Sequence, residues 1–518
     1  MFLRALALSA FLAPTAYAAD GAASQDLEYR EVQGDEDASQ RVVVKAQLES
    51  QWHELNNTDL RQLDESSDQA ILDSDDRSSF AFSGISAEIT VNVDDDTRVV
   101  SGVSHRGLWG NDQLGSTNVF GGWVYFTALY FEHELSNGMK LRVGRQFFEP
   151  GANGGAREYI LSDIVDMVRL DVPLGDKLSL TLIPINVIGS AQDPSDITLV
   201  QYIGQSNVET FGFRGDKMSR RYGLMLAADG LSDKIDARAY AFYTDVGALG
   251  SGSDISYNGR LGNFTDNDWV ANFGLRGQVK LGSVTPFVSV DLSNGIDRKA
   301  LVAPSVNTNG YAGTVGVALD TRDEDSGKGL SGELSGFMAL GPSFTSDGMQ
   351  YSHGYVGMKA RHTGGTLINR YLGWHPTSYV GMFGVDDTQN DYARKSGTMV
   401  GHADLAYNLG GGSIGAGWWY LQDTGVTALN QSNLDNIDPP FGYSREEFAA
   451  EARLGRALGQ ELDLNGSWQM TDAIDLNANA GVFLPGNFYA IPIGRIAGSA
   501  LGGNARAWTV NAGTRVRF

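Results

Sequence analysis

Basic side chains that alternate with apolar residues are the groups best placed to do chemistry in this sequence. Several segments of about ten residues place them at every second position, so they share one face of an extended strand. These residues are Lys140, Arg142, Arg238, Arg276, Lys280, Lys359, Arg361, Arg515 and Arg517. Carboxylates share that phase at Glu88, Asp236, Asp463 and Asp475. If this face lines a passage, the basic groups select anions; alternatively, ion pairs across the face brace the wall.

Motifs for catalysis or metal binding do not appear. The seven histidines include no HExxH motif and no ligand-like pairing, and the sequence has neither a GxSxG motif nor a phosphate-binding loop. The absence of cysteine excludes disulfides, thiolate metal sites and a cysteine nucleophile. Acidic clusters such as Asp94–Asp96 lack the spacing of a calcium loop, and we interpret them as solvated turns. We therefore expect no enzyme, no cofactor and no metal site.

The N-terminal region predicts export from the cytoplasm. Arg4 precedes an apolar run over residues 5–13, and Ala16-Tyr17-Ala18 supplies the small-x-small cleavage pattern, so residues 1–18 are predicted to be a signal peptide. Residues 19–40 are polar and acidic, and are expected to form a periplasmic lead-in. The chain has a net charge of −23, which disfavours nucleic acid as a partner.

Segments of alternating polarity recur from residue 41 to the end of the chain. The last eleven residues, WTVNAGTRVRF, place Trp508, Val510, Ala512 and Val516 on one face and Arg515 and Arg517 on the other. Beyond the signal peptide no stretch approaches the ~18 apolar residues of a membrane helix. A soluble two-layer sheet would alternate in the same way. Short turns that alternate with long loops favour a membrane barrel instead.

The sequence therefore predicts an all-β protein, a transmembrane antiparallel β-barrel over residues 41–518. About twenty candidate strands reduce to a preferred number of 18, within a range of 16 to 20. A barrel of that width has an interior that side chains alone do not fill. The predicted location is the bacterial outer membrane, with membrane lipid against the outer face. The terminal strand ending at Phe518 resembles the signal by which the barrel-assembly machinery recognises outer-membrane proteins.

Two stretches resemble the alginate export family of outer-membrane barrels. The segment 142–146 (RVGRQ), followed by Arg157 and then by 166–170 (DMVRL), is similar to the family's GRQ…R…D-x-V-R segment. The segment 458–463 (LGQELD), followed by 483–486 (FLPG), is similar to its closing arrangement. The resemblance implies an eighteen-stranded monomer that carries a polysaccharide from the periplasm to the cell surface. It also implies that Arg142, Arg145, Arg157, Asp166 and Arg169 lie near the wall or the constriction of the conduit.

These observations predict a porin-like conduit that exports an exopolysaccharide, alginate or another polymer, together with periplasmic polysaccharide-export proteins. The alternative is a passive uptake channel for small solutes, and a third class is an adhesin or structural barrel with a plugged lumen. The expected substrate path contains seven residues. They are Arg142, Arg145, Arg157, Asp166, Arg169, Arg238 and Arg276. One feature departs from the family pattern, because a polyuronate conduit needs a cationic lumen and the polar faces here mix both signs.

Overall fold

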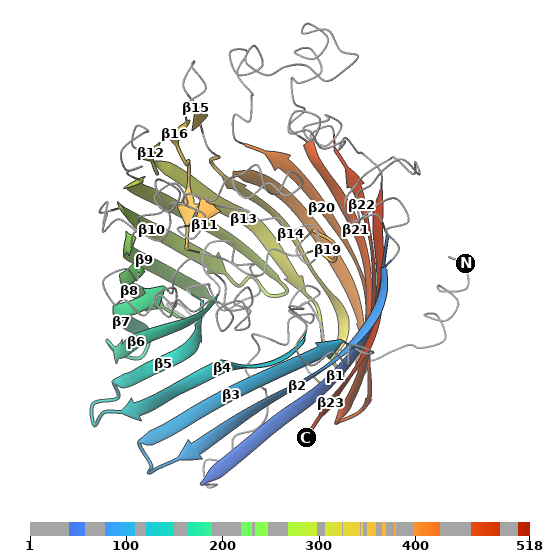
Figure 1. Ribbon diagram of the computed structural model, residues 1–518, viewed down its shortest axis with the longest axis horizontal. Coiled ribbons are helices and arrows are strands. Elements are labelled where there is room, and N and C mark those ends of the chain that lie inside the picture. Colours follow the sequence, from blue (N-terminus) through green and yellow to red (C-terminus); the bar gives the residue numbers. More distant parts are fainter. Residues whose placement is uncertain are drawn as a thin grey trace, which may run out of the picture.

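Eighteen long strands form a closed antiparallel barrel in the computed structural model of the 518-residue chain (Figure 1). The structure describes residues 41–56, 78–108, 121–149, 163–188, 219–229, 234–246, 268–297, 306–323, 325–341, 343–344, 350–358, 365–368, 378–379, 397–424, 457–486 and 506–518. The predicted fold class and strand number are confirmed. The predicted signal peptide and the acidic lead-in lie outside the described residues.

The barrel strands run in sequence order around the wall. They are β1 (Val42–Asn56), β2 (Ser78–Asn92), β3 (Thr97–Leu108), β4 (Gly121–Glu134), β5 (Lys140–Phe148), β6 (Asp163–Pro173), β7 (Leu178–Ile188), β8 (Ser219–Ala228), β9 (Ile235–Val246), β10 (Asp268–Val279), β11 (Val284–Asp297), β13 (Gly310–Asp320), β14 (Lys328–Ala339), β19 (Thr398–Leu409), β20 (Gly412–Asp423), β21 (Ala457–Thr471), β22 (Ile474–Pro485) and β23 (Ala507–Arg517). Short strands add β12 (Val306–Asn307), β15 (Ser343–Phe344), β16 (Gln350–Ser352), β17 (Val356–Gly357) and β18 (Ser378–Tyr379).

The first and last strands close the barrel. β1 pairs with β23 from Gln47 opposite Arg517 to Asn56 opposite Trp508. The backbones of Ala46 and Phe518 add two more hydrogen bonds, of 2.8 and 2.9 Å. Because β1 also pairs with β2, these strands leave no open edge between the two ends of the chain.

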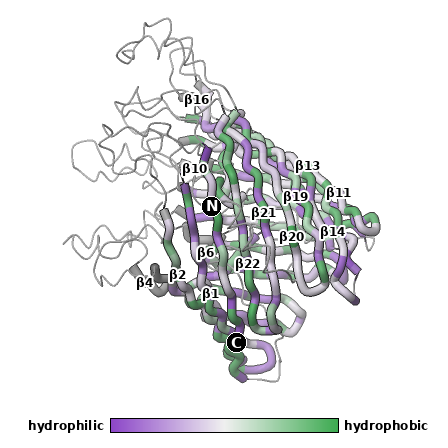
Figure 2. The backbone as a smooth tube through the Cα atoms, turned by 90° about the vertical axis from the view of Figure 1, so that its right-hand side faces the viewer, coloured by the Kyte–Doolittle hydropathy of each residue, from purple (hydrophilic) through white to green (hydrophobic). Residues whose placement is uncertain are grey.

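Strict alternation along each strand gives the wall two different faces. On β10, Phe273 and Leu275 point outward and are 50% and 63% exposed, whereas Asn272 and Arg276 point inward and are buried. Figure 2 shows the resulting change between apolar and polar residues along the strands. The outer face therefore suits lipid and the inner face suits an aqueous lumen. Within the described part of the chain, no helix has the length and apolar character needed to cross a membrane.

Short turns join the strands at one rim of the barrel, which we call the short-turn rim. Gly138 and Gly282 adopt φ angles of 77° and 66° in two of these turns, where a side chain would strain the backbone. In the turn between β2 and β3, a hydrogen bond from Thr97 lowers the pKa of Asp94. In the turn between β13 and β14, the backbone N–H of Ser326 lowers the pKa of Asp323. β1 begins and β23 ends at this same rim.

Candidate functional site: the barrel lumen

Charges of opposite sign are segregated on the inner face of the barrel. The strands from β3 to β10, with the residue that follows β10, carry an excess of basic side chains, which we call the basic wall. They are Arg98, Lys140, Arg142, Arg169, Arg221, Arg238, Arg276 and Lys280, against the carboxylates Glu132, Glu134, Asp171 and Asp236. The strands from β11 to β22 form the acidic wall. Its carboxylates are Asp291, Glu333, Asp404, Asp423, Glu461, Asp463 and Asp475, and at its edge Arg517 of β23 pairs with Asp475.

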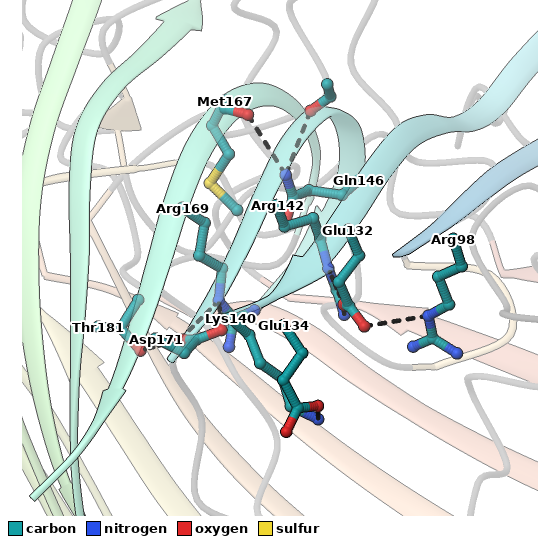
Figure 3. Close-up of polar contacts among 11 residues, drawn as sticks. Arg98, Glu132, Glu134, Lys140, Arg142, Gln146, Met167, Arg169, Asp171 and Thr181 are labelled. Atoms are coloured by element: carbon teal, nitrogen blue, oxygen red, sulfur yellow. Dashed lines mark hydrogen bonds and ion pairs between the residues drawn. The ribbon is translucent and has the colours of Figure 1, made fainter. Parts of the chain in front are cut away.

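Two neighbouring ion-pair groups organise the first part of the basic wall (Figure 3). Glu132 accepts a hydrogen bond from Nε of Arg98 at 3.0 Å and one from Nε of Arg142 at 2.9 Å. The guanidinium of Arg142 also lies 4.7 Å from the centre of the Tyr130 ring. One carboxylate thus holds two guanidinium groups in fixed positions on the inner face.

The second group lies on the next strand. Arg169 lies opposite Arg142 in the pairing of β5 with β6. Its Nε donates to Asp171 at 2.9 Å, and the Thr181 hydroxyl donates to the same carboxylate at 2.6 Å. Each of the two adjacent arginines therefore has its own carboxylate partner, which offsets the repulsion between them.

A third, more deeply buried group joins β9, β10 and β11. Asp291 accepts hydrogen bonds from the Tyr240 hydroxyl and, at 3.0 Å, from Arg276. The exposed fractions of the Arg276 and Asp291 side chains are 6% and 0%. A Cβ atom at Gly274 would lie 2.3 Å from the Tyr240 ring and 2.4 Å from Asp291, so this close packing requires glycine. Arg238 lies opposite Arg276 and pairs with Asp229 at 3.6 Å.

The seven residues predicted to line the path fall into three sets. Arg142, Arg169, Arg238 and Arg276 lie on the inner face, and their part in a substrate path stays a prediction. Arg157 lies outside the described residues. The other two, Arg145 and Asp166, lie on the outer face, since they share a row with the exposed Leu129. Their expected place along the conduit is corrected. Arg145 is three residues from the inward-facing Arg142, and Asp166 is three residues from the inward-facing Arg169. An odd spacing along a strand places two side chains on opposite faces.

The connection between β14 and β19 enters the lumen, which sequence reasoning missed. Residues 352–358 of this connection are buried. Asn272 donates to the Val356 carbonyl at 2.6 Å, Val356 N–H donates to Ser293 at 3.0 Å, and Arg221 donates to the Met358 carbonyl at 3.5 Å. These three partners lie on the inner faces of β10, β11 and β8. The segment is therefore attached to the inside of the wall.

A second segment of the same connection is attached to the acidic wall. The carboxylate of Glu461 on β21 accepts hydrogen bonds from three consecutive backbone N–H groups, at 2.5, 2.6 and 2.8 Å. The donors are Thr366, Leu367 and Ile368, and the side chains of Leu367 and Ile368 pack in the same core cluster as Trp419 and Phe483. Glu461 itself is fully buried.

The two attachments lie on different sides of the barrel. In the ring of eighteen strands, β21 is the eighth strand after β8 when the wall is followed through β14 and β19. Arg221 of β8 and Glu461 of β21 thus hold two parts of one connection on nearly opposite walls. No periodic pattern in the sequence marks this connection, and Glu461 appeared only as one letter of the LGQELD segment.

No family model and no curated protein matches the chain. Among solved structures it is similar to OprD of Pseudomonas aeruginosa (10% identity, 92% of this chain and 95% of that chain, TM-score 0.46). It is also similar to OccD3 (OpdP) of the same organism (9%, 98% and 99%, 0.47) and to OccAB4 of Acinetobacter baumannii (9%, 93% and 100%, 0.46).

A closed barrel with an apolar outer face and a charged lumen is the architecture of outer-membrane proteins. The protein is a bacterial outer-membrane barrel. The short-turn rim is accordingly the periplasmic rim. The predicted membership of the alginate export family is wrong: no family model matches the chain, and the solved structures to which it is similar are those of OprD, OccD3 and OccAB4. The prediction of polysaccharide export, which rested on that resemblance, is corrected with it.

Proposed function

We propose that this protein is a passive uptake channel for small polar solutes. The observation that carries the proposal is the attachment of one connection to both the basic side and the acidic wall of the lumen. Two buried pieces of chain attached to the inner face on different sides, residues 352–358 and 366–368, narrow the route for a flexible polymer more than the route for small molecules. The channel needs no catalytic group, cofactor or metal for this role.

The segregation of charge supports the same proposal. A solute in the lumen has an excess of guanidinium and ammonium groups on one side and carboxylates on the other, so the field points across the direction of transport. Such a field orients polar molecules and lowers the cost of leaving bulk water. The buried ion pairs on the basic wall fix the positions of the charges, which keeps the field constant during passage.

The partners that we propose are the membrane lipid around the apolar outer face and the barrel-assembly machinery. The terminal Phe518 is 66% exposed at the periplasmic rim, where a periplasmic receptor could reach it. The backbone hydrogen bonds between Ala46 and Phe518 form only when the barrel closes, so the terminal residue is accessible before that step.

Liposome swelling tests the proposed function. Proteoliposomes of the full-length protein are placed in isotonic solutions of sugars and amino acids of increasing mass, and then of oligosaccharides. We expect rapid swelling with the small solutes and a sharp fall in rate as mass increases. A barrel that admits long oligosaccharides as fast as monosaccharides, or that admits no solute, would contradict the proposal.

The basic wall is expected to influence ion selectivity. Changing Arg142→Gln and Arg169→Gln removes two positive charges from the inner face, so the ratio of chloride to potassium permeability should fall by about twofold or more. The measurement is the reversal potential across a planar bilayer in a salt gradient. Arg145→Gln is the matched control, because it removes the same charge from the same strand on the outer face and should leave the ratio unchanged. An equal shift in both would contradict the assignment of the inner face.

A further inference from the structure

Arg145 and Asp166 form an ion pair on the outer face of the barrel, which we call the outer ion pair. Nε of Arg145 donates to Oδ1 of Asp166 at 2.9 Å, and a second guanidinium nitrogen donates to Oδ2 at 2.7 Å. The two side chains are 33% and 48% exposed. Along β5 the outward neighbours are Val143 and Phe147, and along β6 they are Ile164 and Val168. The pair is therefore surrounded by an apolar surface.

The depth of the outer ion pair is unusual for charged groups. Arg145 is five residues from the start of β5 at the periplasmic rim, and Asp166 is seven residues from the corresponding end of β6. With a rise of about 3.3 Å per residue and a tilt of about 40°, they lie about 13 and 18 Å from that rim, inside an apolar band about 25 Å tall. At the same depth on β9, β10 and β11 the outward residues are Ala241, Phe273 and Val290.

A second outward-facing charged pair lies farther from the periplasmic rim. Arg220 and Asp245 face one another in the pairing of β8 with β9, just beyond the aromatic residues Tyr222 and Tyr243. They are eight and ten residues from the periplasmic ends of their strands. With the same rise and tilt they lie about 20 and 25 Å from that rim, at the far edge of the apolar band, whereas the outer ion pair lies in its interior. Charges at that depth against lipid destabilise a barrel, so the wall at β5 and β6 needs a different covering.

We propose that the outer face of β3 to β6 is an interface with a second copy of this chain. Charge complementarity favours this partner. In a two-fold symmetric contact each copy presents the same arginine and the same aspartate in reversed order, so Arg145 of each copy meets Asp166 of the other. Four charges then form a closed ring away from lipid. The surrounding exposed residues Phe126, Leu129 and Phe131 add the apolar and aromatic area that interfaces favour.

The absence of cysteine in the chain allows a direct test by disulfide crosslinking. Val168→Cys places one thiol two residues along β6 from Asp166, next to the two-fold axis between β5 and β6, and Val290→Cys places one at a similar depth on the outer face of β11. Both variants are oxidised in intact outer membranes and analysed on non-reducing gels. We expect a product of twice the chain mass for Val168→Cys, at least fivefold more than for Val290→Cys. Equal yields would overturn the proposal.

Exchanging the charges at Arg145 and Asp166 distinguishes an interface between two copies of the chain from a surface that contacts lipid. In the Val168→Cys background, Arg145→Asp alone and Asp166→Arg alone should each lower the crosslinked product at least fivefold. Co-expression of the two variants should restore it, because one copy then carries two aspartates and the other two arginines. Heat-modified gel mobility verifies that each variant is a folded barrel, and the Val168→Cys test stands without these variants. A monomer that retains phosphorylated lipid, and loses that lipid in Arg145→Gln, would overturn the interface.

Discussion

Replacing Glu461 by alanine is expected to widen the channel. The carboxylate accepts three backbone hydrogen bonds from Thr366, Leu367 and Ile368. Loss of about 3 kcal/mol of hydrogen bonding shifts the balance between attached and released segment by on the order of 100-fold. A released segment no longer restricts the lumen, so single-channel conductance should rise and become noisier. Planar bilayer recordings of the purified variant measure both effects.

Two comparisons make this experiment specific. Glu461→Gln keeps one oxygen that can accept hydrogen bonds, so its conductance should lie between those of the wild type and Glu461→Ala. Asn465→Ala lies on the same face of β21, four residues nearer the periplasmic turn, and should leave conductance unchanged. Larger solutes should also swell liposomes faster with Glu461→Ala. Unchanged conductance and an unchanged size limit in a folded Glu461→Ala barrel would show that the segment does not restrict the lumen.

Replacing Asp291 by alanine is expected to be the most destabilising change in the barrel wall. Arg276 would then keep a buried guanidinium without its carboxylate, and the Tyr240 hydroxyl would lose its acceptor. Breaking a buried pair by removing one partner costs about 3–5 kcal/mol. The measurement is the urea midpoint of unfolding in detergent, followed by tryptophan fluorescence. Asp325→Ala, in an exposed turn, is the control and should leave the midpoint unchanged.

Removing both charges tests the origin of that cost. The double variant Asp291→Ala/Arg276→Met should recover a large part of the lost stability, because no uncompensated charge remains in the wall. If the double variant were as unstable as the sum of the two single variants, the effect would come from packing around Gly274 rather than from the loss of the carboxylate beside the Arg276 guanidinium. The two outcomes differ by several kcal/mol in the free energy of unfolding, which the same urea titration measures.

Alternation of polarity predicted the two faces of the strands, and the alternation of short turns with long loops predicted the barrel. The same alternation of polarity predicts the correct, outer face for Arg145, which lies three residues from the inward-facing Arg142. An odd spacing in a regular strand places two residues on opposite faces. The family resemblance grouped both arginines along one conduit, and this grouping overrode the simple rule of periodicity. Asp166 and Arg169 repeat the same odd spacing and the same outcome.

Local sequence patterns could not predict that the β14–β19 connection is attached to the inside of the barrel wall. Glu461 and its nearest donor, Ile368, are 93 residues apart in the sequence. A carboxylate in a strand reads as one more polar-phase residue, and consecutive backbone N–H groups are not encoded by any residue type. Only the three-dimensional closure of the barrel brings the acceptor and the donors together. The segregated walls were likewise invisible until the order of the strands around the ring was known.

The pairing of β1 with β23 has a consequence for how the molecule is made. Thr509 donates to the carbonyl of Glu54, a contact between residues 455 positions apart. The entropy of closing so long a loop must be lost before that contact is formed, so the seam forms late and slowly. Until then the growing sheet has two edges with unpaired backbone groups that can join other chains. Pairing of the final eleven-residue strand with β1 thus ends the period during which the chain can aggregate. Deletion of this strand would leave a sheet with two open edges.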